Sequence, residues 1–366
     1  MLLRRAHNLV CYWRDGAFVI QNHLSGTEVS LAPMAVEILA AFTDPTTADE
    51  VAKAFPDHDP ESCRAAVAEL HGFGFLVADD EDAAARDAHL AEHWRSWSPE
   101  ASALHFSSKD AAYTDSPEVN ADFRAGTRSP LFKTLPHADR ILLPRAPLDV
   151  DADFVRTLYR RRTHRRFRRE PLPLPVLAGL LAMVFGPSEF LDGDDFGALM
   201  KRTSAAGGSR HELEAYAAVF DVEGVTPGLY HYNVLEHSLE LLDEGFTRER
   251  AAYLSFDQEA VAQAPVTFFV TAVVSRMSSK YRAPRAYRVM LMNAGHLGQT
   301  FALTATALGL GPFQTAAFRD GELEAALGVD GITETALYVL AAGVPDERPE
   351  ERYTAGLDAF RRARLH

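Results

Sequence analysis

The chain has few cysteines, no surplus of basic residues and no long hydrophobic run, and each shortage excludes a class of protein. Its 366 residues include only two cysteines, Cys11 and Cys63. Their spacing fits neither a zinc nor a redox motif, so we expect no metal site and no disulfide framework. Lys and Arg number 37 against 51 Asp and Glu, a formal net charge of −14. General nucleic-acid binding depends on a basic surface, so we do not expect nucleic acid as a partner.

The hydrophobic segments are too short for a membrane protein. No stretch is long and apolar enough to span a bilayer, and residues 1–13 lack the apolar run and cleavage site of a signal peptide. We therefore expect a soluble, cytoplasmic protein that does not bind membranes. A strand–GxGxxG–helix unit is also missing, which indicates that the chain has no separate nicotinamide-binding domain.

The length suggests about two domains, and the sequence pattern changes at two points. Residues 1–80 read as three short strands, three helices and a closing strand. Residues 81–150 read as a polar helix followed by an extended connector rich in Pro, Ser and Asp. Residues 151–366 combine helices, a hairpin and buried strands, with a nearly all-apolar helix predicted over 287–311. We therefore expect an α+β fold for this last domain.

The most unusual charged segment is YRRRTHRRFRRE, residues 159–170, which holds seven arginines in an acidic chain. Arg161, Thr163 and Arg165 alternate, so an extended backbone would point them to one side. Guanidinium groups bind phosphate oxygens through paired hydrogen bonds, so two of them and one hydroxyl suffice for one terminal phosphate. A solvated, charged helix end explains the same residues equally well.

This segment opens a series of four blocks that resembles the nitroreductase superfamily. The blocks are, in order, RRRTHRRF with PLPLPVLAGLLAMVFG, RTSAAGGSRHELEAYAAVF, VTPGLYHYNVLEHSLELL and AYRVMLMNAGHLGQTFALTATALGLG. Within the superfamily they resemble the SagB-type dehydrogenases, which are FMN-dependent azoline oxidases of thiazole- and oxazole-modified peptide pathways. The resemblance covers about residues 94–346. It implies a nitroreductase-like α+β fold, an obligate homodimer and FMN bound at the subunit interface.

The resemblance also assigns residues to the cofactor. Arg161, Thr163 and Arg165 would hold the FMN phosphate. The residues that would line the flavin are Ser204, Ala205, Gly207, Gly208, Ser209, Gln299, Gly309, Leu310 and Gly311. Small residues let the backbone approach a flat ring closely, although SAAGG without the family reads as a plain flexible loop. Thr300 stands where the family usually has Asn. Arg348 and Arg352 would add phosphate contacts near the C-terminus.

A Lys-Tyr pair precedes the long helix, and the resemblance assigns the chemistry to it. Azoline oxidases carry such a pair before an aromatic-Arg…Gly-His block, which here is YR…GH at 287–296. Dehydrogenation takes a proton from carbon while a hydride goes to flavin N5. Lys280 would take that proton, and Tyr281 would relay or orient it. The residues alone also allow a surface Lys-Tyr in a loop. We expect His296 to be a hydrogen-bonded structural histidine.

Residues 9–78 resemble a PqqD-like peptide-recognition domain, a winged-helix-like module. That family binds a leader peptide as a strand added to its sheet. The groove would lie between residues 28–31 and the helix expected over 59–72. A dimerisation or packing module with a degenerate groove is the alternative. The helix carries few basic residues, which argues against DNA binding.

These expectations combine into one function with two alternatives. The protein would oxidise thiazoline or oxazoline rings to thiazole or oxazole in a ribosomally made peptide, with FMN as cofactor. The missing nicotinamide-binding unit fits a flavin that oxygen reoxidises, although nitroreductase-like enzymes can bind NAD(P)H without such a unit. Its partners would be a second copy of the chain, the modified precursor peptide and a possible cyclodehydratase subunit. The alternatives are an FMN-dependent NAD(P)H reductase of nitro, quinone or dehydroamino-acid substrates, and a non-catalytic peptide-binding scaffold for a partner cyclodehydratase.

Overall fold

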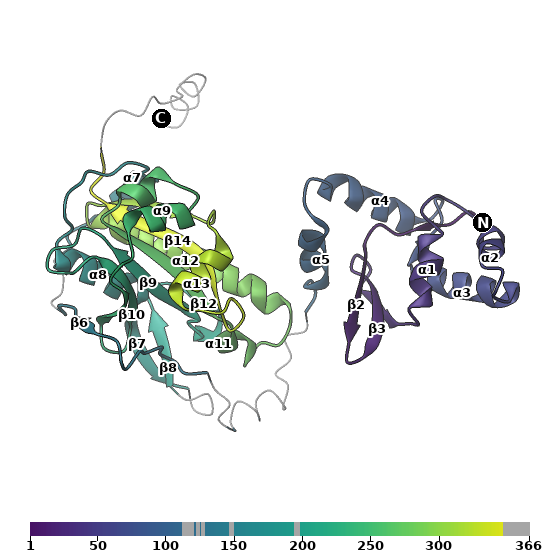
Figure 1. Ribbon diagram of the computed structural model, residues 1–366, viewed down its shortest axis with the longest axis horizontal. Helices are drawn as coiled ribbons and strands as arrows, with labels where there is room; N and C mark the ends of the chain where they lie inside the picture. Colours follow the sequence, from purple (N-terminus) through teal and green to yellow (C-terminus); the bar gives the residue numbers. More distant parts are fainter. Residues whose placement is uncertain (112–120, 122–124, 126–128, 146–149, 194–197, 347–366) are drawn as a thin grey trace, which may run out of the picture. The chain divides into compact units, whose positions relative to one another are not determined.

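The computed structural model describes residues 1–346 except 112–120, 122–124, 126–128, 146–149 and 194–197. The chain divides into two compact units. The first is Met1–Tyr113 with Ala283–Arg285, and the second is Thr114–Arg282 with Ala286–His366 (Figure 1).

The first unit contains the strands and helices that the sequence predicts for its N-terminal part. Strands β2 (Leu9–Arg14), β3 (Ala17–Asn22) and β4 (Thr27–Ser30) form an antiparallel sheet in that order. A second pairing joins β1 (Arg4–Arg5) to β5 (Leu76–Val77). The three predicted strands are therefore confirmed.

The first unit contains five described helices, and the second and third of them begin at side-chain caps. They are α1 (Met34–Ala40), α2 (Ala48–Ala54), α3 (Pro60–Gly72), α4 (Asp82–Trp94) and α5 (Pro99–Ser107). Thr47 and Glu50 form a capping box at α2, and Asp59 accepts the Ser62 amide at 2.8 Å at the start of α3. Ile20, Phe42 and Leu70 are buried in the core between the sheet and the helices.

The second unit is built on a seven-stranded antiparallel sheet. Its order is β13-β14-β12-β9-β10-β11-β6. The strands are β6 (Arg140–Leu142), β9 (Leu213–Val219), β10 (Gly228–Asn233), β11 (Ser238–Asp243), β12 (Val266–Val273), β13 (Gly311–Thr315) and β14 (Glu334–Gly343). The predicted hairpin is β10–β11, and the predicted buried strand is β12. Strand β6 comes from the segment expected to be a connector.

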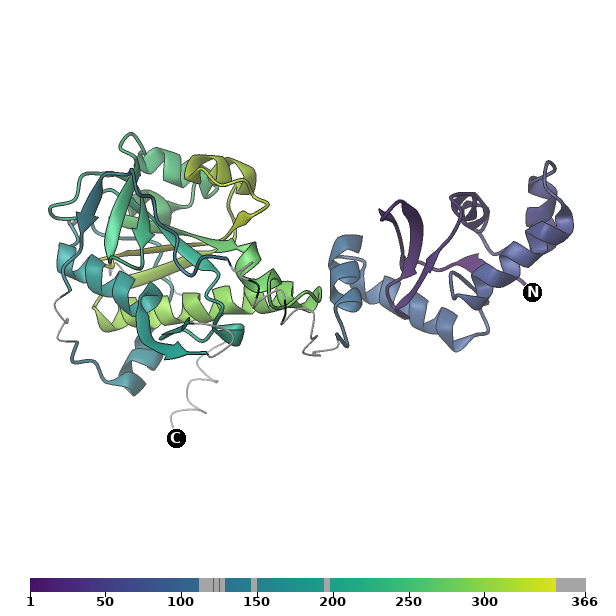
Figure 2. The same ribbon diagram turned by 90° about the horizontal axis from the view of Figure 1, so that it is seen from below.

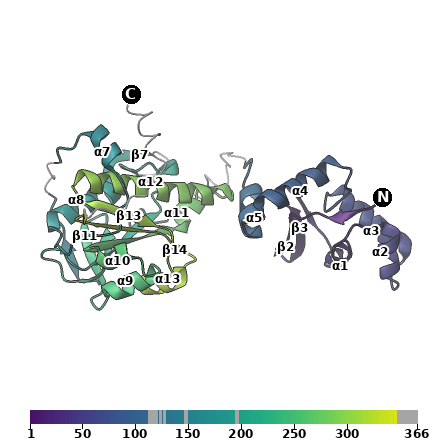
Figure 3. The same ribbon diagram turned by 90° about the horizontal axis from the view of Figure 1, so that it is seen from above.

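Helices cover both faces of this sheet (Figures 2 and 3). One face packs against α8 (Leu174–Phe185) and α12 (Arg285–Ala307), and the other against α9 (Arg248–Leu254), α10 (Glu259–Gln263) and α13 (Asp320–Leu327). Successive residues of a strand point to opposite faces. Phe268 of β12 therefore packs with α12, and its neighbour Phe269 packs on the opposite side. The α+β expectation is confirmed.

The shorter elements of the second unit surround this core. They are α7 (Phe154–Arg160), the hairpin β7 (Pro187–Asp192) and β8 (Ala198–Arg202), a 3₁₀ turn η2 (Gly207–Ser209) and α11 (Val274–Ser278). None of the described helices is long and apolar enough to cross a membrane.

Candidate functional site

The loop between β8 and β9 is attached to α12 by a short chain of buried hydrogen bonds. The Gly207 amide donates to Asn293 Oδ1 at 3.0 Å, and Asn293 Nδ2 donates to Glu212 Oε1 at 2.8 Å. Asn293 is 2% exposed and Glu212 is fully buried. His296 adds a contact between its Nδ1 and the Ala205 carbonyl at 3.2 Å, as expected of a structural histidine. The loop expected to be flexible without the family is thus held in place.

Two glycines of this loop leave no space for a larger residue. A Cβ at Gly207 would lie 2.5 Å from Val289 Cγ1, which is too close for two carbon atoms. Gly208 has a φ of +61°, and a Cβ there would meet the hydroxyl of Tyr281. Gly207 therefore requires glycine because a side chain would collide with Val289. Gly208 requires glycine because a side chain would collide with Tyr281 and because its backbone is left-handed.

The close approach at Gly208 brings the Lys-Tyr pair to the loop. Lys280 and Tyr281 are half-buried and follow α11 directly. Their amides donate to the Met277 carbonyl at 3.2 and 2.9 Å, which fixes the turn. Tyr281 lies against Gly208, so a residue expected to act in catalysis meets one expected to line the flavin.

The arginine-rich segment meets a different group of predicted residues. Arg161 caps the end of α7, and its amide donates to the Thr157 carbonyl at 2.9 Å. Further on, the His164 amide donates to the Pro312 carbonyl at 2.9 Å, and a Cβ at Gly311 would lie 2.7 Å from His164 Cγ. The segment therefore lies against the Gly-Leu-Gly turn.

The remaining predicted residues vary in exposure. Arg161 is half-buried, Leu310 is buried, and Thr163, Arg165 and Gly309 are exposed. Gln299 is exposed on α12. The Thr300 hydroxyl donates to the His296 carbonyl of its own helix at 3.1 Å. Arg348 and Arg352 lie outside the described residues.

Several polar side-chain atoms of this loop are buried without a partner among the described residues. Ser204 Oγ, His211 Nε2 and Glu212 Oε2 accept or donate no hydrogen bond within the part of the chain that the structure describes. Burial and the nearby Arg202 guanidinium lower the pKa of His211 to about 4, so the ring is neutral. Burial raises the pKa of Glu212, against the opposing effect of the Asn293 hydrogen bond. Buried polar atoms of this kind mark the place of a ligand or ordered water.

Strand β9 is anchored by a second polar cluster that faces away from solvent. His231 lies between Glu240 Oε2 at 2.9 Å and Glu214 Oε2 at 3.2 Å, and Arg276 pairs with Glu214 at 2.5 Å. Burial alone would raise the pKa of Glu214, but the His231 hydrogen bond and the Arg276 charge lower it to about 2. Arg276 also donates to the His211 carbonyl at 3.1 Å. This cluster fixes the strand that directly follows His211 and Glu212.

The sequence reasoning did not identify Asn293, Glu212 or Val289. The sequence pattern that could have indicated these residues is weak. Asn293 is a polar residue on the helix face that also carries the buried Met290 and Leu297. A polar residue on such a face needs a buried hydrogen-bond partner, but the sequence does not reveal that the partner is Glu212, 81 residues away.

Comparison with protein-family models gives a match over residues 158–344, about half of the chain, to the nitroreductase family. The chain belongs to this family. The nitroreductase-like fold that the sequence predicts is therefore confirmed, and proteins of this family generally bind FMN.

Two curated relatives and one solved structure illustrate the similarity. The trifolitoxin-processing protein TfxB of Rhizobium leguminosarum bv. trifolii is 30% identical over 186 residues, which cover 47% of this chain and 48% of TfxB. The putative nitroreductase MJ1384 of Methanocaldococcus jannaschii is 33% identical over 173 residues, covering 47% of this chain and 82% of that protein. A putative nitroreductase from Anabaena variabilis is 24% identical with a TM-score of 0.49, covering 65% of this chain and 49% of that one. The chain thus spans only about half the length of TfxB.

Proposed function

We propose that this protein is an FMN-dependent dehydrogenase that oxidises azoline rings to azoles during maturation of a ribosomally made peptide. The observation that carries the proposal is the contact of Tyr281 with Gly208, which joins the Lys-Tyr pair to the small-residue loop. The relative TfxB, named for trifolitoxin processing, supports a role in peptide maturation.

The residues present fit FMN. The loop is held in place by the bond from the Gly207 amide to Asn293, and the buried Ser204 Oγ of the same loop has no protein partner within the described residues. Arg161 and Arg165 form none of the ion pairs found in that part of the chain, so their guanidiniums are available to a phosphate. We assign the phosphate to Arg161, Thr163 and Arg165 and the ring to the loop.

The reaction removes one proton and one hydride from the azoline ring. Bound FMN supplies the hydride acceptor. The protein supplies the base and the geometry. In this proposal Lys280 Nζ takes the proton from the ring carbon, and the Tyr281 hydroxyl, which lies beside Gly208, relays or orients that proton. Half-burial of both side chains restricts the access of bulk water to the reacting atoms.

The Lys280→Ala variant tests this assignment. A peptide carrying an azoline ring should lose two hydrogens with the wild type, as read by mass spectrometry, and should stay unchanged with the variant. Flavin content should be the same in both. Lys201→Ala is the matched control, because Lys201 is an exposed lysine paired with Glu189 at 2.9 Å on the β7–β8 hairpin. Full activity of the Lys280→Ala enzyme would refute the assignment.

A reductase is the second candidate, because MJ1384 is named a putative nitroreductase. The same variant separates the two functions. An NAD(P)H-dependent reductase of nitro or quinone substrates does not need a lysine base and should keep its activity in Lys280→Ala. A purified protein that stays colourless after incubation with FMN would instead favour the peptide-binding scaffold.

We further propose that the active form is a homodimer built on α12. Tyr287, Leu291 and Met292 are 45%, 44% and 55% exposed on this helix, and Phe154 and Tyr159 are 67% and 89% exposed on α7. Large apolar side chains exposed to solvent on a helix are typical of protein interfaces. A second copy of the chain is the partner we assign to them.

For the N-terminal unit we propose leader-peptide binding at β4. Strand β4 pairs only with β3 among the described strands, so its other edge can accept an added strand. Val29 of β4 and Val67 of α3 contact one shared core, which places the helix behind that strand. The partners proposed for this unit are the precursor peptide and a cyclodehydratase subunit. Loss of precursor binding in Val29→Pro, without loss of flavin, would support this assignment, and unchanged binding would refute it.

A further inference from the structure

One buried arginine, Arg276 of α11, connects three segments of the chain beside the Lys-Tyr pair. It is 5% exposed, and its Nη1 lies 2.5 Å from Glu214 Oε1 of β9. The same Nη1 donates to the His211 carbonyl at 3.1 Å, and Nε donates to the Pro130 carbonyl at 2.9 Å. The guanidinium therefore joins α11 to β9, to the end of the β8–β9 loop and to the segment that precedes β6.

The Lys-Tyr pair depends on α11 for its position. Lys280 and Tyr281 follow this helix closely, and both of their amides donate to the Met277 carbonyl. Met277 is the next residue after Arg276 and is 3% exposed. A contact that fixes Arg276 therefore also fixes the turn that carries the pair.

The loop expected to line the flavin is attached to the same guanidinium. The loop residue that accepts from Arg276 is His211, and the loop residue that meets Tyr281 is Gly208. Arg276 thus holds both the helix before Tyr281 and the loop that Tyr281 contacts.

We infer that Arg276 is a positioning residue, which keeps the turn of Lys280 and Tyr281 at a fixed place against this loop. The inference rests on the proposed function, because Arg276 acts through Lys280 as the proton acceptor. A displacement of about 1 Å between reacting groups can slow a reaction about 100-fold. Restricting the turn keeps Lys280 at the distance that proton transfer requires.

The arrangement of the acceptors requires an arginine. A guanidinium presents its N–H donors in a rigid planar fork, whereas a lysine ammonium is a compact point charge on a flexible chain. Arg276→Lys would keep a positive charge beside Glu214 and lose bonds to the backbone carbonyls. The start of α11 is held separately, since the Val274 amide donates to the Thr333 carbonyl at 3.0 Å. The variant should therefore keep the fold and loosen the turn.

Arg248 of α9 offers a matched control. It pairs with Asp221 and donates to the Ala264 carbonyl, so it also combines a carboxylate with a backbone acceptor. Its side chain is 12% exposed. Helix α9 packs on the sheet face opposite α12. Arg248→Lys should therefore remove comparable bonds and leave the Lys-Tyr turn unchanged.

The test uses purified, FMN-supplied protein and a peptide with one thiazoline ring. Mass spectrometry gives kcat and KM from the loss of two hydrogens, and it gives the rate at which acetic anhydride acetylates Lys280. We expect Arg276→Lys to lower kcat at least about tenfold, with KM and flavin content within about twofold of the wild type. Acetylation of Lys280 should become several-fold faster, because the turn is less restricted. Arg248→Lys should change none of these values.

Glu214→Gln is a second variant, which leaves the guanidinium in place and weakens its pairing. It should change kcat and acetylation in the same direction and by less, and it supplies the test if thermal unfolding shows that Arg276→Lys does not fold. Unchanged kcat and acetylation in the folded variants would overturn the inference.

Two other results would overturn it as well. Loss of flavin in Arg276→Lys would show that this residue acts on cofactor binding, and equal changes in Arg248→Lys would show a general effect of stability. A wild type that leaves the peptide unoxidised would refute the proposed function. The acetylation rates would then decide alone whether Arg276 holds the turn.

Discussion

Replacing Gly207 by alanine should destabilise the second unit and weaken FMN binding together. The added Cβ would lie 2.5 Å from Val289 Cγ1 and 3.9 Å from its next neighbours, so the conflict is with one methyl group. Val289 is β-branched and lies on α12, where its χ1 rotamer is nearly fixed. The side chain cannot rotate away, and either the loop or the helix must shift.

The loss of unfolding free energy in Gly207→Ala can be estimated from this steric conflict. Overpacking by one methyl costs about 1–3 kcal/mol. A loop shift that breaks the bond from the Gly207 amide to Asn293 would add about 1 kcal/mol. In a domain of this size each kcal/mol lowers the melting temperature by about 2–4 °C. Gly207→Ala should therefore melt several degrees below the wild type.

Val289→Ala should rescue this variant, because it removes the methyl group that the new Cβ meets. The double variant should be more stable than the sum of the two single effects by about 1–2 kcal/mol. Gly321→Ala is the control, because a Cβ at Gly321 in α13 meets nothing within 4 Å. Circular dichroism gives the melting temperatures, and quenching of flavin fluorescence gives the FMN affinity. Additive effects, or a Gly207→Ala protein with wild-type stability and affinity, would refute the reasoning.

Three further predictions concern proton linkage and assembly. Burial raises the pKa of Glu212, so ionisation of this carboxyl group lowers the stability of the fold as pH rises through that pKa. Glu212→Gln keeps the hydrogen bond from Asn293 and removes the ionisable group. This variant should therefore gain stability relative to the wild type from pH 5 to pH 8, as measured by urea titrations. The pKa of His211 is lowered to about 4, so below pH 6.5 the unfolded chain binds a proton that the fold excludes, and stability should fall by up to about 1.4 kcal/mol per pH unit between pH 6.5 and 4. His211→Gln should flatten that slope, and an unchanged slope would contradict the assignment. Replacing Leu291 and Met292 by lysine should convert dimer to monomer in light scattering, whereas a wild-type monomer would exclude the proposed interface.

The sequence predicted elements whose residues repeat with one clear period. The long helix was expected over 287–311 and is observed as Arg285–Ala307, because Gly309, at a φ of +77°, follows its end. Strand β12 was recognisable from its β-branched and aromatic run. Strong local patterns of this kind need no knowledge of the partner element.

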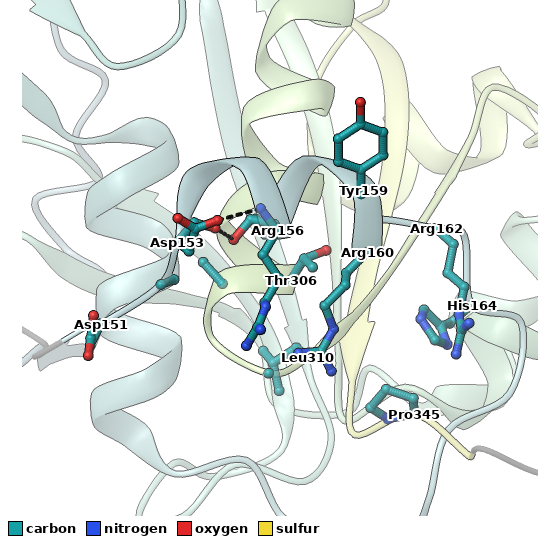
Figure 4. A pocket seen from close by; sticks show the side chains of 14 residues that line it. Asp151, Asp153, Arg156, Tyr159, Arg160, Arg162, His164, Thr306, Leu310 and Pro345 are labelled. Carbon is teal, nitrogen blue, oxygen red and sulfur yellow. Dashed lines mark hydrogen bonds between the residues drawn. The ribbon is translucent and has the colours of Figure 1, made fainter. Parts of the chain in front are cut away.

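Elements without a local pattern were not predicted. All residues of β7 are exposed, so no alternation marks it as a strand. Strand β6 has three residues and takes its place from pairing with β11. The bond between Asn293 and Glu212 joins residues 81 positions apart, and one cavity combines α7 with the end of α12 (Figure 4). Such sites depend on tertiary packing, which periodicity does not describe.

Flavin content is the most direct measurement of this account. Purified protein supplied with FMN should show flavin absorbance at one FMN per chain, and Arg161→Gln with Arg165→Gln should lose most of it while keeping its melting transition. Arg250→Gln, a change at an exposed arginine on α9, is the control and should retain the wild-type spectrum. A colourless wild-type protein that FMN cannot reconstitute, or a double variant with full flavin content, would contradict the assignment of FMN to this chain and its phosphate to these arginines.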